Sequence, residues 1–432
     1  MPPLHLLLLP ATCICLLAVA SAQEQNKTTG TPGWYRDSER ARTLSQLTEK
    51  EAAKFAATDL LDVRPVIIPT PENTVGANDY FMWPIATMVD DTMVVLYARS
   101  PCHWGPDSGN SGGMGGIRMV VTSSDGGKTW SKPVDVFEAG KWEKTPFRGF
   151  GGGLGTHDGI VYLALCQGVY RSKDKGRTWE LVTDQPDFSR VPGVTWAPGM
   201  RITFDDEHGL TLWTTSGFSE DYEARAKRGQ YGTHMVALYS PDFGKTWYHQ
   251  SQPLPDGLRL SEVTAIQFEG QIAFFLRNGL KKTHFGQGYS ASGWFPFQFA
   301  CSDIGPVEII DTPDIQFNPQ TKRLEAGAPF RRGNGPGPKG RMKVNLYSMA
   351  VDELAAGSTN WRYDGTLIRY RERFGVSDGF NIVGSVIDTK RNRKVYHVWG
   401  GDCTGTAGIF QYTLSLDTRA VADYLKTFYQ SP

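Results

Sequence analysis

Ser123 to Trp130, with the sequence SSDGGKTW, form the first of three copies of one short motif. The pattern S-x-D-x-G-x-T-W returns at Ser172 to Trp179 (SKDKGRTW) and at Ser240 to Trp247 (SPDFGKTW). Each copy follows an apolar run that predicts a strand. Its residue types suit a tight turn, because Asp and Ser side chains can hydrogen-bond the turn backbone and Gly accepts a left-handed conformation. The three copies therefore predict hairpins repeated along one fold.

Short apolar runs separated by Gly, Asp and Asn continue from Val63 to the C-terminal region, which is typical of an all-β protein. The motif copies start at positions 123, 172 and 240, so the intervals are 49 and 68 residues. These intervals suit units of about 40–50 residues with one insertion, which we place at Phe218 to Gly232. A degenerate copy with an insertion is expected at Tyr347 to Trp361. Strands are expected at Ile85 to Tyr97, Ile117 to Thr122, Ile160 to Leu165, Arg201 to Phe204, Leu210 to Trp213, Met235 to Tyr239, Ala265 to Phe268, Gln271 to Leu276, Val344 to Ala350, Asn381 to Ile387, Lys394 to Trp399 and Gly408 to Leu414.

The motif resembles the Asp-box, and the chain resembles the sialidase superfamily of β-propellers with Asp-box (BNR) repeats. The resemblance implies a six-bladed β-propeller of sialidase type over residues 63–432. In that family Asp-boxes are blade corners far from the chemistry, so they indicate a fold more than a function. A short closing helix is expected at Asp417 to Gln430.

The first 22 residues have the pattern of a cleaved export signal. Leu6 to Leu9 and Cys13 to Val19 are apolar, and Ala20 to Ala22 (ASA) is a small-residue cleavage site. A membrane anchor is the alternative, but the run is short and interrupted by Pro10. A secreted or periplasmic protein is therefore expected, with no later segment apolar enough to cross a bilayer.

Residues 23–62 are expected to be an N-terminal extension that carries a short helix. Apolar residues recur at roughly helical spacing over Arg36 to Asp59, and we place this helix outside the ring.

Composition excludes several classes of partner. The chain has 45 basic and 45 acidic side chains, so nothing indicates a nucleic-acid face or a polybasic membrane patch. No CxxC or clustered Cys/His spacing suggests a metal site, and no cofactor is expected. Cys102, Cys166, Cys301 and Cys403 would remain after signal cleavage, either in two disulfides or as free thiols.

Tyr80 to Ala86 (YFMWPIA) resembles the Y-F-R-I-P-A segment of sialidases. The arginine of that segment is the first of three that grip the carboxylate of sialic acid. Met82 stands in its place here and Trp83 follows it, and we expect both at the substrate site. Methionine cannot donate a charge-assisted hydrogen bond, so one arm of the clamp is missing.

The resemblance places the family's acid/base aspartate at Asp107, in the loop from Arg99 to Asn110. A half-enclosed carboxyl group beside aromatic residues can acquire the raised pKa that this role needs. The alternative is an ordinary turn aspartate. His103 in the same loop is a rival acid/base, because imidazole titrates near neutral pH, or it is a packing residue.

Leu260 to Asn278 carries the strongest functional match. In sialidases a glutamate opens this strand pair and deprotonates a tyrosine nucleophile, and the second clamp arginine closes it. Glu262 and Arg277 stand at these positions. Two strands and a turn bring them to the same end of a blade, so they can face one pocket or form a structural ion pair.

The remaining site positions are less regular. Arg201 could reach a ligand anion or form a salt bridge at a blade edge. Arg341 is the candidate for the third clamp arginine, with Arg331 and Arg332 as rivals. Phe380 stands where the nucleophilic tyrosine is expected, and phenylalanine cannot attack. Three tyrosines on neighbouring strands could substitute for it: Tyr347, Tyr370 and Tyr396.

These features predict a secreted, exo-acting glycoside hydrolase of sialidase-like type that cleaves a terminal sugar, anionic or neutral, from a glycan or glycoconjugate. Two alternatives stay open. One is a polysaccharide lyase on the same propeller, in which His103, a tyrosine and Arg277 act on a uronic acid. The other is a non-catalytic propeller that binds glycans or proteins.

Overall fold

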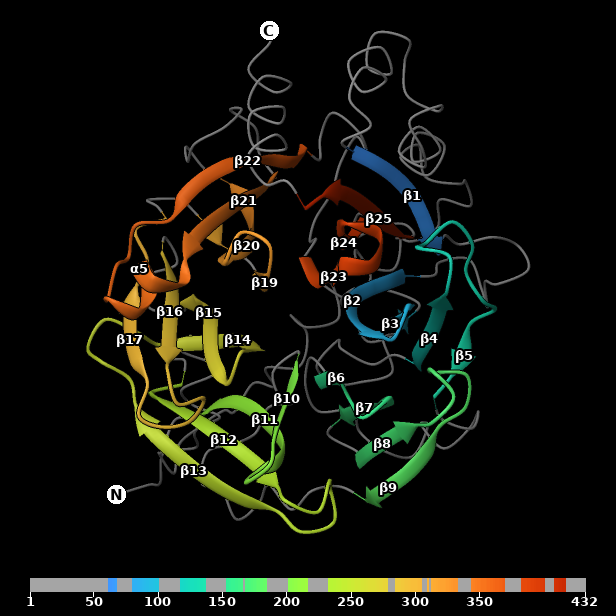
Figure 1. Cartoon of the computed structure of the whole chain (residues 1–432), viewed down its shortest axis with the longest axis horizontal. Helices are drawn as coiled ribbons and strands as arrows, with labels where there is room; N and C mark the ends of the chain where they lie inside the picture. Colours follow the sequence, from blue (N-terminus) through green and yellow to red (C-terminus); the bar gives the residue numbers. More distant parts are fainter. Residues whose placement is uncertain are drawn as a thin grey trace, which may run out of the picture.

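The computed structural model describes residues 61–67, 80–100, 117–136, 153–165, 168–184, 201–216, 232–278, 284–304, 309–310, 312–332, 343–369, 382–400 and 408–416. Their strands form six antiparallel sheets arranged around a central axis (Figure 1). The predicted all-β fold with a six-bladed β-propeller is therefore confirmed.

The first four blades each run outward from the axis in chain order. Blade 1 contains β2 (Tyr80–Val89), β3 (Thr92–Ser100), β4 (Ile117–Ser123) and β5 (Val134–Asp135). Blade 2 contains β6 (Gly153–His157), β7 (Ile160–Leu165), β8 (Gly168–Ser172) and β9 (Glu180–Asp184). Blade 3 contains β10 (Ile202–Asp205), β11 (Gly209–Ser216), β12 (His234–Ser240) and β13 (Tyr248–Pro253). Blade 4 contains β14 (Leu260–Phe268), β15 (Gln271–Asn278), β16 (Phe285–Ser290) and β17 (Gln298–Cys301).

The last two blades depart from this plan. Blade 5 begins with two short strands that both pair with β20, and α5 lies between its last two strands. Its elements are β18 (Ile309–Ile310), β19 (Asp314–Asn318), β20 (Arg323–Arg332), β21 (Lys343–Ala350), α5 (Val351–Ala355) and β22 (Arg362–Arg369). Blade 6 contains β23 (Ile382–Asp388), the 3₁₀ turn η6 (Thr389–Arg391), β24 (Arg393–Gly400), β25 (Gly408–Ser415) and, outermost, β1 (Leu61–Ile67).

The first described strand closes the ring. β1 pairs antiparallel with β25, with Leu61 opposite Leu414 and Ile67 opposite Ile409. The sixth blade is therefore built from both ends of the propeller sequence, because the strand that precedes blade 1 in the chain is held in the sheet of the last blade (Figure 1).

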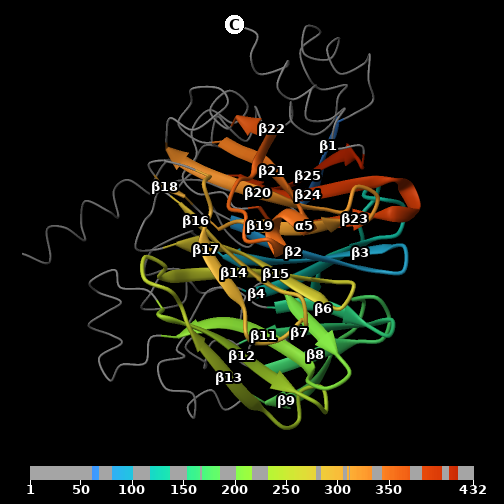
Figure 2. The ribbon, with the colours of Figure 1, turned by 60° about the vertical axis from the view of Figure 1, so that its left-hand side comes forward.

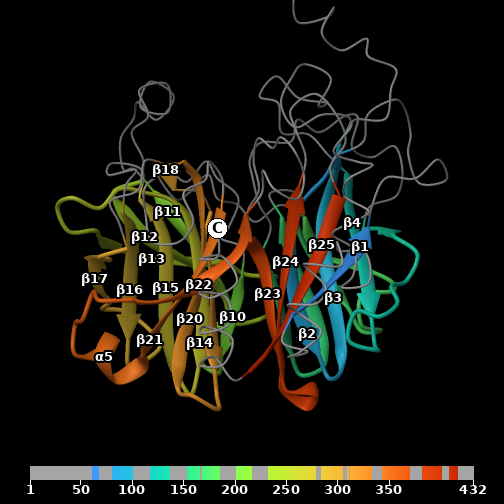
Figure 3. The same ribbon diagram turned by 90° about the horizontal axis from the view of Figure 1, so that it is seen from above.

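The antiparallel strands give the propeller two faces (Figure 3). At one face, which we call the loop face, the innermost strand of each blade begins and the second strand ends. The tight hairpins after the inner strands and the three motif turns lie at the other face, which we call the turn face. Residues near the start of one inner strand can therefore contact residues near the start of the inner strand of the next blade, because both lie at the loop face.

The three motif copies form the same turn between the third and fourth strands of blades 1, 2 and 3. In each copy the Ser hydroxyl donates to the Asp carboxylate over 2.8 Å and accepts from the Gly amide over 2.6–2.7 Å. The same carboxylate accepts from the backbone amides of the residues three and four positions after the Asp. One side chain therefore orders the whole turn. The hairpins predicted from the motif are confirmed.

A fourth turn of this kind lacks the sequence pattern. In blade 4, Ser290 Oγ lies 3.0 Å from Ser292 Oγ, the residue in place of Asp, and Phe297 is buried where the motif has Trp. In blade 5, the expected degenerate copy at Tyr347 to Trp361 does contain an insertion, which is α5. Trp361 is buried beyond it and donates from Nε1 to Gln287 Oε1 over 2.9 Å.

The blades stand side by side around the axis (Figure 2). Clusters of buried apolar side chains combine residues of neighbouring blades. Between blades 3 and 4, for example, the fully buried ring of Trp213 lies edge-on to Phe274 and Phe297, with centroids 5.0 and 5.3 Å away. This edge-to-face geometry is favourable for aromatic pairs, and it stabilises the contact between blades 3 and 4.

One expected strand is wrong. Ile85 to Tyr97 is not continuous but belongs to the β2–β3 hairpin, which turns at Asp90 and Asp91. Asp90 has a φ of 53°, a left-handed conformation that Asp tolerates better than most residues. Both arms of the hairpin are strongly apolar, so the hydrophobic pattern hid the turn.

Several sequence predictions lie outside the described residues: the helix at Arg36 to Asp59, the insertion at Phe218 to Gly232 apart from its last residue, and the closing helix at Asp417 to Gln430. Cys301 Sγ accepts from Asn278 Nδ2 over 3.7 Å, and the disulfide and free-thiol alternatives for the four cysteines stay predictions. Within the described part of the chain, no helix is long and apolar enough to span a membrane, and no His/Cys/Asp/Glu group could hold a metal ion.

Candidate functional site

Glu262 and Arg277 meet at the loop face of blade 4. They are cross-strand partners near the start of β14 and the end of β15, and β14 is the innermost strand of its blade. Arg277 Nη1 donates to Glu262 Oε2 over 2.8 Å, and the side chains are 23% and 16% exposed. The two residues are thus side by side at the axis, as expected, and they form an ion pair with one another.

Thr312 is the third member of this cluster. It lies just before β19, the inner strand of the next blade, and its hydroxyl donates to Glu262 Oε2 over 2.5 Å. Thr264 on β14 donates to the carbonyl of Pro313 over 2.8 Å. These bonds tie the entry of blade 5 to blade 4. Sequence reasoning missed Thr312, although it stands at the start of an inner strand just as Glu262 does.

Arg201 spans the axis of the propeller. Its guanidinium, at the entry to β10, reaches Asp314 on β19 with three N–O distances of 3.0–3.2 Å. It also donates to the carbonyl of Ser385 on β23 over 2.8 Å. The hydroxyl and amide of Ser385 in turn donate to Asp314. Arg201 therefore links blades 3, 5 and 6 and makes the salt bridge that was the alternative to a ligand-binding role.

Met82 and Trp83 have unusual surroundings for substrate-contacting residues. Met82 is completely buried in the apolar cluster that also contains residues of blades 2 and 6. Trp83 is 7% exposed and has a φ of 53°, in a segment where the β2–β3 register shifts. Met82 therefore contributes apolar packing at the position where the family carries a cation.

Two of the candidate tyrosines are described, and both are buried in strands other than the inner ones. Burial raises the pKa of Tyr347 and, more strongly, that of Tyr396. A phenol with a raised pKa is harder to convert to the nucleophilic phenolate, so neither group is prepared for attack. Asp107, His103, Arg341, Tyr370 and Phe380 lie outside the described residues, and their roles stay predictions.

Comparison with known proteins supports the fold. No family model matches the chain, and no curated protein matches it by sequence. A solved structure of a protein of unknown function from Dyadobacter fermentans is similar with a TM-score of 0.56 and 14% identity, over 82% of this chain and 99% of that one. The NanB sialidase of Streptococcus pneumoniae gives 0.53 and 10%, over 82% and 70%. The Trypanosoma rangeli sialidase gives 0.52 and 11%, over 83% of this chain and 58% of that one. At these identities the similarity shows a shared propeller fold alone.

Proposed function

We propose that this protein is an exported, exo-acting glycoside hydrolase of sialidase-like type and that its repeat turns are Asp-boxes of that superfamily. The observation that carries the proposal is the Glu262–Arg277 pair, which lies on the innermost strand of blade 4 and the strand beside it, at the loop face of a propeller similar to those of sialidases. The similarity to sialidase structures makes a glycan-related function plausible. The export signal at residues 1–22 fits action on extracellular glycans.

In this proposal Glu262 is the general base that takes a proton from the attacking water, and Arg277 orients both Glu262 and the sugar. Asp107 or His103 supplies the proton to the leaving oxygen, because general acid catalysis needs a group that can be protonated at the working pH. Thr312 holds Glu262 from the neighbouring blade, so its carboxylate has little freedom to rotate.

The charge balance of the described site bears on the sugar. Arg201 is matched by Asp314 and Arg277 by Glu262, while Met82 supplies no charge. A carboxylate sugar would therefore have to compete with a protein carboxylate for each of these two guanidinium groups. This favours a neutral terminal sugar over sialic acid.

The test is a panel of chromogenic glycosides, with sialic acid, uronic acid and neutral sugars, incubated with wild type and Glu262→Gln. Turnover per folded molecule in the variant should fall by about 10²–10⁴, the usual contribution of a general acid or base, with the folded fraction measured separately because Arg277 and Thr312 lose their acceptor. Glu269→Gln is the matched control, because Glu269 lies at the opposite end of the same strand pair.

Three outcomes would replace the proposal. Full activity in Glu262→Gln would remove Glu262 from the chemistry. An ultraviolet-absorbing unsaturated product would indicate a lyase, and saturable glycan binding without any product would indicate a non-catalytic propeller.

A further inference from the structure

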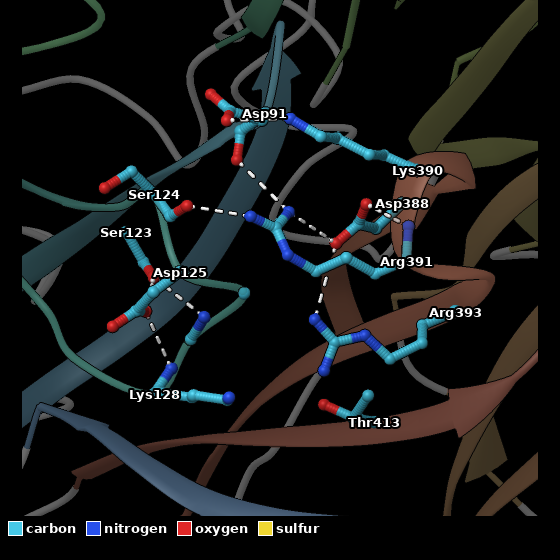
Figure 4. A network of polar contacts seen from close by, with 12 residues as sticks. Asp91, Ser123, Ser124, Asp125, Lys128, Asp388, Lys390, Arg391, Arg393 and Thr413 are labelled. Carbon is cyan, nitrogen blue, oxygen red and sulfur yellow. Dashed lines mark hydrogen bonds and ion pairs between the residues drawn. The ribbon is translucent and has the colours of Figure 1, made fainter.

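The first repeat turn is docked onto the last blade. Arg391 Nη2 donates to the carbonyl of Ser124 over 2.8 Å (Figure 4), and Gln411 Nε2 on β25 donates to the carbonyl of Gly126 over 3.2 Å. The contact is tight, since a Cβ atom on Gly127 would lie 1.8 Å from Gln411 Oε1. This turn therefore has a neighbour across the closure of the ring.

Its tryptophan differs from the other two. In the second and third repeat turns the indole Nε1–H donates to the turn's own glycine carbonyl, Trp179 to Gly176 over 3.2 Å and Trp247 to Gly244 over 3.0 Å. Trp130 Nε1 is buried and has no hydrogen-bond partner in the protein. Its ring instead stands edge-on to His397 of β24, with centroids 5.9 Å apart.

Two buried acceptors without a protein partner belong to the strands against which this turn packs. His397 is fully buried, and its Nδ1 is 2.6 Å from the carbonyl of Gly384. A carbonyl can only accept, so Nδ1 carries the proton and Nε2 is a bare acceptor. His397 Nε2 and Gln411 Oε1 both lack a partner. These residues are directly opposite one another on β24 and β25 and therefore point to the same side of the sheet.

Buried polar groups are rarely left unpaired, because each costs about 1–3 kcal/mol. One N–H donor and two acceptors are within what a water molecule can bind, because it donates two hydrogen bonds and accepts up to two. Arg393 Nε, four residues before His397 on β24, is another buried donor without a partner but lies further along the strand.

We propose that the junction between the first and last blades contains a binding site for one structural water molecule, which accepts from Trp130 Nε1 and donates to His397 Nε2 and Gln411 Oε1. The water replaces the indole-to-glycine bond of the other two repeat turns. It joins the first repeat turn to both β24 and β25 at the closure of the ring.

A high-resolution crystal structure of the full chain tests the site directly. Solvent density is expected at about 2.7–3.2 Å from all three atoms. The proposal is wrong if the indole bonds directly to His397 or Gln411, if it bonds to Gly127 as its counterparts do, or if the space is dry.

Nuclear magnetic resonance gives a second test with internal controls. In protein labelled with ¹⁵N at tryptophan and histidine, the indole proton of Trp130 should show a cross-peak to a long-lived water molecule, whereas those of Trp179 and Trp247 should not. Trp130→Phe should remove that peak and shift the imidazole ¹⁵N resonances of His397, and Trp179→Phe should do neither. A Trp130 proton without contact to water, or a His397 spectrum that is unchanged in Trp130→Phe, would overturn the assignment. Only the wild-type spectra are needed if the variant fails to fold.

Discussion

At the scale of single residues, the repeat turns show how one carboxylate organises a hairpin. Asp174 accepts from the hydroxyls of Ser172 and Thr178 and from two backbone amides. Asp174→Ala should therefore lower the free energy of unfolding by about 1–2 kcal/mol, because turn donors lose their acceptor. The measurement is chemical denaturation, with the exposed Asp206→Ala as control. Activity per folded molecule should not change, since the turn lies at the face opposite Glu262. A large loss of activity at unchanged stability would contradict this assignment.

At the scale of the element, the first repeat turn depends on what it packs against. Gly127 has a φ of +82°, and its Cβ would strike the buried Gln411 side chain. Gly159 has a similar φ of +73°, but a Cβ there would meet nothing within 4 Å. Both alanine variants carry the left-handed strain of roughly 1–2 kcal/mol. Gly127→Ala should be less stable than Gly159→Ala by a further 1–3 kcal/mol or so, the range for overpacking. Equal denaturation midpoints would show that the turn is not held against blade 6.

The elements also show what could be predicted from the sequence. The repeat turns were predictable because nearly all their hydrogen bonds lie within eight residues. The strand pair with Glu262 and Arg277 was predictable from a spacing of 15 residues. Thr312 was not, because its partner is 50 residues away, and neither was the Arg201–Asp314 bridge, which spans 113 residues. Local pattern carries no signal for contacts that depend on how blades meet around the axis.

At the scale of the whole molecule, closure of the ring is reinforced by a polar cluster at the turn face (Figure 4). Asp388 is 1% exposed and accepts from Arg391 over 3.0 Å, with Arg393 at 3.5 Å. Asp388→Asn leaves two cations without their carboxylate, so the free energy of unfolding should fall by about 3 kcal/mol. Asp91→Asn is the control, because Asp91 pairs with Lys390 at the surface and such pairs contribute little. If the two variants are equally stable in denaturant, the cluster does not hold the ring together.

His397 should make closure of the ring sensitive to acid. Burial lowers its pKa to about 4, against the opposing effect of its bond to Gly384. The ordinary value is near 6.5, so the unfolded chain binds a proton that the folded protein excludes between these two pH values. The free energy of unfolding should therefore fall as the pH drops from about 6.5 to about 4, by roughly 3 kcal/mol from this group alone. Burial also lowers the pKa of His234, and this adds to the pH dependence of stability in wild type and in a His397→Gln variant alike.

Chemical denaturation across this pH range should show that the free energy of unfolding changes less steeply with pH for His397→Gln than for wild type, because the amide does not titrate. Identical slopes would mean that the imidazole is accessible to protons in the folded protein and that the junction of blades 1 and 6 opens without unfolding.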